Sequence, residues 1–275
     1  MIRAPKGASA SFAILKIFMR CSCLLFVIIC FLLCVGKPPE FPGAENSLFS
    51  RLEMVYCPGS KNRGKGGAGM ITTYIWDLDG TLLDSYDSIV SSLAALSREC
   101  GAESCRNEIL QAVKQGSVSG WLRSFSEKNG MDYSGLYRRY REISHGRMDE
   151  ITLIPGARET LAALQRSGAL HFVYTHRGAS TGPLLDRLGL TAFFREIVTF
   201  ESGFLPKPSG EGVRYLLQKY RLDPAETAYV GDRALDVGCA RDAGVRAVLF
   251  LPEGSCVKPT GEEDRIIRSL EELIP

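Results

Sequence analysis

The spacing of apolar residues changes along the chain, and each change predicts a new kind of element. Residues 74–76 form a short, β-prone apolar run that ends at two carboxylates. After Ser85 the apolar positions recur at helical spacing. Helical patterns follow one another in four segments: 86–100, 103–115, 120–128 and 133–147. Because no convincing strand interrupts residues 86–150, we expect a small bundle of helices inserted after the first strand.

Beyond residue 150, short apolar strands alternate with helices. The predicted strands are 170–174, 196–200, 227–230 and 245–251. The predicted helices are 155–167 with Pro155 in its first turn, 181–188, 209–220, 234–243 and a closing helix at 262–273. This alternation predicts the α/β class, a doubly wound, mostly parallel sheet with right-handed crossovers. Residues 70–85 and 151–275 would form this core, with ligands beyond the carboxyl ends of its strands.

The first predicted strand ends in a pair of carboxylates, Asp77 and Asp79. Side chains alternate along a strand, so these two leave its end on the same side while Leu78 points away. Such a pair suits a divalent cation, or acid and base work if the two environments separate the pKa values. Gly80 follows at once and allows the backbone to approach a phosphate closely.

Polar residues also follow the later predicted strands. Thr175 and His176 come after one of them, and Asp232 comes after another, with Asp236 one helical turn further on. Lys207 stands between two prolines and therefore on a stiffened backbone. Because the carboxyl ends of parallel strands share one edge of a sheet, we expect these residues to meet Asp77 in space.

These motifs, in this order, resemble the haloacid dehalogenase (HAD) superfamily, most of whose members transfer phosphoryl groups. The matching stretches are D-x-D-G-T at 77–81, Thr175, Lys207 and G-D-x-x-x-D at 231–236. The first two motifs lie 98 residues apart, which leaves room for a helical cap at 86–150, whereas the second and third lie only 32 apart. The resemblance is therefore to subfamily I, phosphoglycolate-phosphatase-like enzymes, in which a small α-helical cap closes over the site.

The resemblance implies a Mg²⁺-dependent phosphomonoester hydrolase that acts through an aspartyl-phosphate. Asp77 is then the nucleophile, Asp79 the general acid and base, and Lys207 a catalytic cation. The implied phosphate-binding residues are Gly80, Thr175, His176 and Lys207. The implied Mg²⁺ ligands are Asp77, Asp79 through its backbone carbonyl, Asp232 and Asp236, the last either orienting the waters of the metal or binding Lys207. His176 stands where these relatives usually carry Asn, which leaves the substrate open.

The implied substrate is a small phosphorylated metabolite. Arg123 and, after it, Lys114 are the candidate contacts from the helical cap, while His176 and Arg177 either reach the leaving group or form an exposed loop pair. Two other functions stay open. One is a phosphomutase of the β-phosphoglucomutase type, which returns the phosphate to a sugar; the other is a non-catalytic phosphate-sensing or membrane-anchored interaction protein.

Charge and cysteine content separate residues 1–69 from the rest of the chain. This stretch holds nine Lys/Arg and three Asp/Glu, which leaves 24 and 28 for residues 70–275, a net charge of −4. A mildly acidic body argues against a nucleic-acid partner. Only four of the nine cysteines lie in it and none forms a C-x-x-C pair, which argues against a zinc site or disulfide framework there.

Residues 1–69 also contain an uncharged apolar segment at 21–36, which is short for a membrane-spanning helix. We expect residues 1–69 to be an N-terminal extension that is disordered or lies upstream of the native start. Translation from Met70 would place the first strand at the N-terminus of a cytoplasmic enzyme. The alternative is export or membrane anchoring through the segment 21–36.

Overall fold

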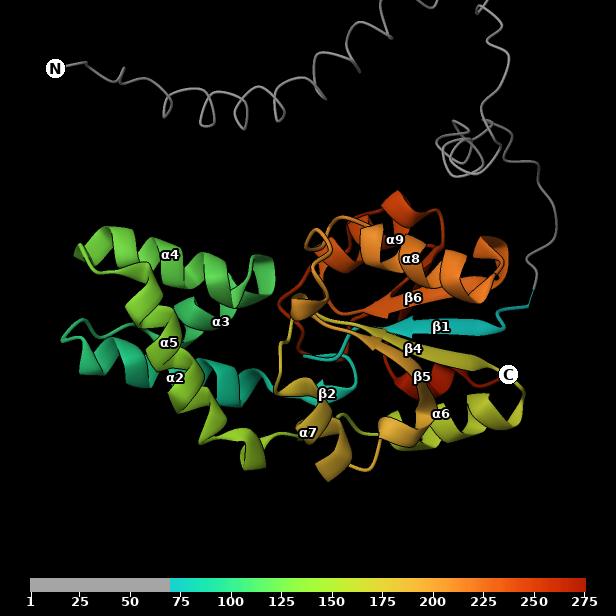
Figure 1. The fold of residues 1–275 in the computed structure, drawn as a ribbon, viewed down its shortest axis with the longest axis horizontal. Coiled ribbons are helices and arrows are strands. Elements are labelled where there is room, and N and C mark those ends of the chain that lie inside the picture. The colour runs from blue at the N-terminus through green and yellow to red at the C-terminus, as the bar shows by residue number, and fades with distance from the viewer. Residues whose placement is uncertain (1–69) are drawn as a thin grey trace, which may run out of the picture. The chain divides into compact units, whose positions relative to one another are not determined.

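Six parallel strands form one sheet in the computed structural model of the protein, which describes residues 70–275. In spatial order they are β5 (Phe194–Val198), β4 (Leu170–Tyr174), β1 (Thr73–Trp76), β6 (Thr227–Gly231), β7 (Arg246–Phe250) and β8 (Arg265–Ile267). The first strand of residues 70–275 lies in the middle of the sheet, and the strand order reverses around it (Figure 1). The predicted α/β fold class is confirmed.

Helices cover both faces of this sheet (Figure 1). One face carries α6 (Ala157–Arg166) and α7 (Thr181–Arg187), and the other carries α8 (Glu211–Tyr220) and α9 (Ala234–Ala243). Neighbouring residues of β1 serve opposite faces: Trp76 packs in the hydrophobic cluster beneath α6, and Ile75 packs in the cluster beneath α8. Both side chains are fully buried, and all four positions of this strand are buried, as expected for a central parallel strand.

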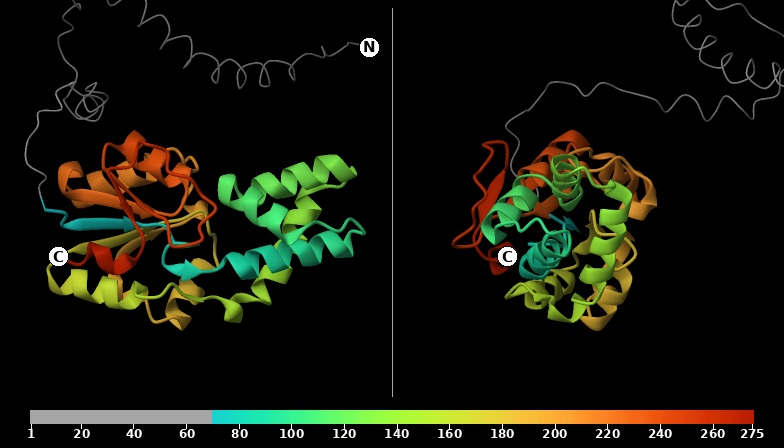
Figure 2. Two further views of the ribbon diagram at one scale, coloured as in Figure 1. Left: turned by 180° about the vertical axis from the view of Figure 1, so that it is seen from behind. Right: turned by 90° about the vertical axis from the view of Figure 1, so that its left-hand side faces the viewer.

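Between β1 and β4 the chain forms four further helices, which we call the helical insertion. They are α2 (Tyr86–Glu99), α3 (Arg106–Gln115), α4 (Val118–Asn129) and α5 (Tyr133–His145). The helical insertion has a hydrophobic cluster of its own, in which Leu93, Ile109 and Leu122 are fully buried. It lies beyond the carboxyl end of β1, and the second view of Figure 2 looks onto it from the side on which it lies in Figure 1.

A two-stranded antiparallel ribbon, which the sequence pattern does not predict, marks the entry to and the exit from the helical insertion. It pairs β2 (Leu83–Asp84) with β3 (Thr152–Leu153). Two residues per strand carry too little periodicity to be detected from sequence. The ribbon places both connections of the helical insertion side by side, next to the D-x-D motif.

The predicted closing helix at 262–273 is wrong. Residues Arg265–Ile267 instead add strand β8 to the free edge of β7, and only a short 3₁₀ turn follows at Leu270–Leu273. The β-branched pair Ile266 and Ile267 favours a strand. Asp264 fixes the register, because its carboxylate accepts the Ala247 N–H at 2.8 Å.

Two boundaries also differ from the predicted ones. Helix α6 begins at Ala157, so Pro155 lies before the helix and not in its first turn. Gly156, at φ +76°, turns the chain in a left-handed conformation that favours glycine. Strand β5 begins at Phe194, two residues before the predicted strand at 196–200, and its last predicted residue lies in a 3₁₀ turn.

The predicted N-terminal extension, with its apolar segment 21–36, lies outside the described residues. Within residues 70–275, no helix has both the length and the apolar character needed to cross a membrane.

Candidate active site

The polar motifs meet where the central strands end. Asp77 follows β1, Thr175 follows β4 and Asp232 follows β6, and β1 pairs with both of the other strands. All three side chains are buried. Lys207 reaches the same place from the loop between β5 and α8. The topology of the sheet therefore gathers residues from four distant parts of the sequence.

Lys207 binds two carboxylates at once. Its Nζ donates to Asp77 Oδ1 and to Asp236 Oδ1, each at 2.7 Å, and to the Tyr229 hydroxyl at 3.1 Å. Burial lowers the pKa of a lysine, but Asp236 and Asp77 outweigh it here and raise the pKa of Lys207 above its usual value. Lys207 is therefore a fixed cation held against one oxygen of Asp77.

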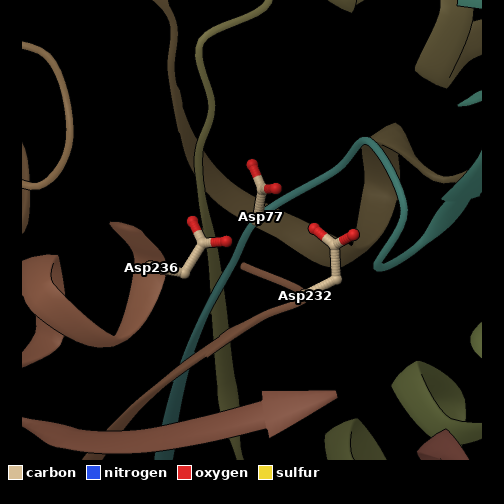
Figure 3. A group of neighbouring side chains, drawn as sticks. All are labelled: Asp77, Asp232 and Asp236. Atoms are coloured by element: carbon tan, nitrogen blue, oxygen red, sulfur yellow. The ribbon is translucent and has the colours of Figure 1, made fainter. Parts of the chain in front are cut away.

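Three carboxylates form an acidic cluster: Asp77, Asp232 and Asp236 each offer an oxygen within 4.8 Å of the others (Figure 3). Burial raises the pKa of Asp77, and it raises that of Asp232 to about 7. Asp236 differs, because Lys207 and Arg233 outweigh burial and lower its pKa.

The unpartnered oxygens of this cluster fit a divalent cation. Asp77 Oδ2 and both Asp232 oxygens are buried without a hydrogen-bond partner among residues 70–275. Buried carboxylate oxygens are costly without a partner, and oxygen donors are the ligands that Mg²⁺ prefers. The Asp236 oxygens are already occupied, since they accept from Lys207 Nζ and from the Arg233 backbone N–H. Asp77 and Asp232 thus have oxygens available for a metal, and Asp236 orients Lys207.

Asp79 forms an ion pair with Arg177 beside this cluster. Arg177 Nε donates to Asp79 Oδ2 at 3.3 Å, and Nη2 donates to Oδ1. Burial alone would raise the pKa of Asp79, but the Arg177 guanidinium outweighs it and holds the pKa below its usual value. The side chains of Arg177 and Asp79 are 9% and 19% exposed, against 1% for Asp77. This pair therefore lies nearer the opening of the site than the nucleophile candidate.

Gly80 is needed for the turn after the D-x-D motif. Its φ is +85°, and a Cβ there would lie 2.2 Å from the Tyr86 ring and 2.4 Å from Asp232 Oδ2. The Gly80 N–H is already used, because it donates to the Leu83 carbonyl at 2.8 Å. The structure thus places Gly80 at a close approach of backbone to Asp232 and Tyr86.

Thr175 and His176 occupy the loop after β4. The Thr175 hydroxyl oxygen accepts the Arg177 backbone N–H at 3.1 Å, and His176 Nε2 accepts the Lys207 backbone N–H at 2.8 Å. Burial and the nearby Lys207 lower the pKa of His176 to about 3, which keeps the ring neutral and able to accept. His176 therefore holds the Lys207 loop through a ring nitrogen.

Arg233 is a site residue that the motif analysis missed. Its Nη2 lies 3.7 Å from Asp77 Oδ2, and its Nε lies 3.7 Å from Asp232 Oδ1. Its Nη1 reaches the Gly116 carbonyl of the helical insertion at 3.5 Å. The sequence feature that points to Arg233 is its position as a cation between the two acids of the G-D-x-x-x-D motif.

The two predicted substrate contacts of the helical insertion lie in different surroundings. Lys114 Nζ lies 4.5 Å from the ring centroid of Tyr86, which packs beside Gly80. Arg123 is exposed and stacks over Tyr133, 5.0 Å from its ring centroid, within the helical insertion. Lys114 thus borders the site through Tyr86, whereas Arg123 pairs with its own helical neighbours.

The sequence also matches a known family. The profile described as haloacid dehalogenase-like hydrolase matches residues 74–250. The protein belongs to this family. Curated relatives of this HAD hydrolase include the pyrophosphatase PpaX of Bacillus velezensis, 29% identical over 74% of this chain and 95% of the relative. A phosphoglycolate phosphatase of Pseudomonas syringae pv. tomato is 30% identical over 73% of this chain and 78% of the relative.

Solved structures share the fold of this HAD hydrolase. A protein described as a predicted phosphoglycolate phosphatase from Haemophilus somnus superposes with a TM-score of 0.67 at 21% identity, covering 75% of this chain and 98% of that one. A HAD-like hydrolase from Bacteroides fragilis superposes with a TM-score of 0.65 at 24% identity, covering 74% of this chain and all of that one. The family and its phosphatase-named relatives make the protein a phosphatase.

Proposed function

We propose that the protein is a Mg²⁺-dependent phosphomonoester hydrolase that acts through an aspartyl-phosphate on a small phosphorylated metabolite, as phosphoglycolate phosphatases do. One observation carries this proposal. Asp77 is buried with one oxygen fixed on Lys207 and the other without a hydrogen-bond partner among residues 70–275, and both oxygens of the neighbouring Asp232 are buried without one as well. The names of the two relatives, a phosphoglycolate phosphatase and a pyrophosphatase, support a small phosphate compound as substrate.

In the first half-reaction Asp77 Oδ2 attacks phosphorus, the bond from phosphorus to the leaving oxygen breaks, and that oxygen takes a proton from the Asp79 carboxyl. The Thr175 hydroxyl donates to the phosphoryl oxygens, and the fixed positive charge of Lys207 offsets negative charge there. In the second half-reaction water attacks phosphorus, its proton passes to Asp79, and the aspartyl bond breaks to release phosphate. Arg177 favours the ionised, proton-accepting form of Asp79 that this second step needs.

A divalent cation belongs beside this phosphate. The residues proposed to hold it are Asp77, Asp232 and the backbone carbonyl of Asp79, with Asp236 acting through Lys207. When bound, Mg²⁺ offsets the repulsion between the attacking carboxylate and the phosphate dianion. The helical insertion, with Lys114 at Tyr86 and Arg123 further out, is proposed to close over the substrate and exclude bulk water.

Replacing Asp77 by Asn tests the proposal, because the amide keeps the shape of the side chain and removes the nucleophile. We expect D77N to lose at least about a thousandfold in Mg²⁺-dependent phosphate release, by the magnitude typical of nucleophile loss. Asp149→Asn, at an exposed carboxylate, should leave turnover unchanged. Release of inorganic phosphate without a bisphosphate primer separates a phosphatase from a mutase. Full turnover by D77N would reject the assignment.

A further inference from the structure

Arg177 borders the place where the leaving group must lie. It is bonded to the same Asp79 carboxylate that is proposed to deliver a proton to the leaving oxygen. The charges of Arg177 and Asp79 also affect the pKa of Tyr140 of α5, which burial raises to about 12. Arg177 is thus placed directly beside the proposed acid.

The guanidinium of Arg177 has more N–H donors than the hydrogen bonds among residues 70–275 use. Of its five N–H groups, two bind Asp79, and a third reaches Ser180 Oγ at only 3.5 Å. Two N–H groups therefore have no partner among residues 70–275, although the side chain is only 9% exposed. These two N–H groups, one on Nη1 and one on Nη2, can donate charge-assisted hydrogen bonds to a carboxylate or a phosphate.

We propose that Arg177 binds an anionic group on the leaving side of the substrate. The preferred substrates then carry a carboxylate or a second phosphate within a few bonds of the ester oxygen. This inference rests on the proposed function. The transferred phosphoryl group has the buried Thr175 hydroxyl as a donor and the fixed charge of Lys207 beside it, so the free N–H groups of Arg177 remain for the leaving group. Because Arg177 stays bonded to Asp79, it also aligns that carboxylate with the oxygen it must protonate.

The test compares substrates with and without an anionic leaving group. One pair is 2-phosphoglycolate and its neutral amide, and the other is pyrophosphate and methyl phosphate; the two pairs distinguish carboxylate from phosphate recognition. The leaving groups of the second pair also differ in reactivity, so its ratio is interpreted only by comparison between the wild type and the Arg177 variants. Phosphate release with Mg²⁺ gives kcat and KM for each compound. We expect the wild type to favour at least one anionic member by about 30-fold or more in kcat/KM, since a charged hydrogen bond is typically worth this much.

Arg177→Met and Arg177→Lys then ask whether this residue makes the distinction. For Arg177→Met we expect the ratio within the favoured pair to fall to about threefold or less, with the loss mainly on the anionic member. Arg177→Lys should recover part of the ratio, because it restores one charged donor. Arg241→Met is the matched control: Arg241 also pairs with a carboxylate, Asp264 at 2.9 Å, so losing it should leave the ratio unchanged. If a substitution of Arg177 also disturbs Asp79 and slows both members of a pair equally, that effect cancels in the ratio of their kcat/KM values.

The possible results test this inference separately from the proposed phosphomonoesterase function. An equal rate on charged and neutral members in the wild type overturns the inference, and so does an unchanged ratio in folded Arg177→Met. If Arg177→Met is not folded, as shown by the absence of a cooperative unfolding transition, the inference is tested by the wild-type ratio and by Arg177→Lys. Absence of phosphate release from all four compounds by the wild type would instead count against the proposed phosphomonoesterase function.

Discussion

Lys207 gives the site its charge balance at the scale of a single residue. It is a fully buried cation that separates two buried carboxylates, Asp77 and Asp236. A buried ion pair adds little net stability compared with an apolar pair, but removal of one partner leaves uncompensated charge in a poor solvent. The same contact fixes Asp77 Oδ1 and leaves Oδ2 for the proposed attack, so Lys207 has a structural role and a proposed chemical one.

Lys207→Met should therefore destabilise the metal-free protein strongly. We expect the free energy of unfolding to fall by about 3–5 kcal/mol, because the carboxylates on either side lose their shared cation. Urea denaturation at pH 8 without Mg²⁺ measures this loss. Lys258→Met, at an exposed lysine, is the control and should leave the midpoint unchanged. If Lys207→Met lowers the free energy of unfolding by less than about 1 kcal/mol, the buried contacts of Lys207 with Asp77 and Asp236 are not formed in solution.

Two loops that follow neighbouring strands are joined at the scale of elements. The loop after β4 supplies His176, and the loop before α8 supplies the Lys207 N–H that its ring accepts. The Tyr174 hydroxyl adds a second bond, donating to the Leu205 carbonyl at 2.8 Å. These bonds anchor the Lys207 loop on the sheet and so direct its ammonium group toward Asp77.

Protonation of His176 would break the bond to Lys207, so stability should depend on pH through this residue. The folded pKa is about 3, whereas an unfolded histidine titrates near 6.5. Below about pH 6.5 the unfolded chain binds the extra proton, so this contribution is fully present above that pH and is lost as pH falls toward 3. Between pH 7 and pH 5, the wild type should lose about 2 kcal/mol relative to His176→Asn, which keeps an acceptor but does not titrate.

Urea unfolding at several pH values, compared between wild type and His176→Asn, measures this difference, because contributions from the other groups cancel. His145→Asn, at an exposed histidine, should show no such change relative to wild type. Parallel pH profiles for wild type and His176→Asn would contradict the bond between the two loops.

The elements differ in how far their sequence alone predicts them. The sequence predicts the positions of Asp77 and Asp232 at strand ends, because each follows an apolar run directly and this signal is local. It does not predict strand β8, since three residues are too few for a period and the pairing that decides their conformation is with β7.

The side-chain partnerships were beyond sequence reasoning for a related reason. Arg177 lies 98 residues after its partner Asp79, and Arg233 reaches Gly116 in the helical insertion. Nothing in the local pattern of either arginine distinguishes a buried partner from an exposed loop charge. Only the closure of the sheet and the placement of the helical insertion bring these pairs together.

At the scale of the whole molecule, a single sheet edge unites the site. The central position of β1 brings Asp77 between the ends of β4 and β6, and the ribbon of β2 and β3 sets the helical insertion next to that edge. Arg233 and Lys114 then connect the two parts, through the Gly116 carbonyl and the Tyr86 ring. The core supplies the proposed phosphoryl chemistry, and the helical insertion borders the side from which a substrate would approach.

Asp77 is proposed to carry the phosphoryl group between the two half-reactions. The direct measurement mixes the protein with Mg²⁺ and a substrate labelled in its phosphoryl group, quenches with acid at short times, and maps the label by peptide digestion. We predict a transient label that hydroxylamine removes, located on the peptide containing Asp77 and absent from D77N. Phosphate release at full rate with no protein-bound label at any quench time, or a label on another residue, would contradict the account.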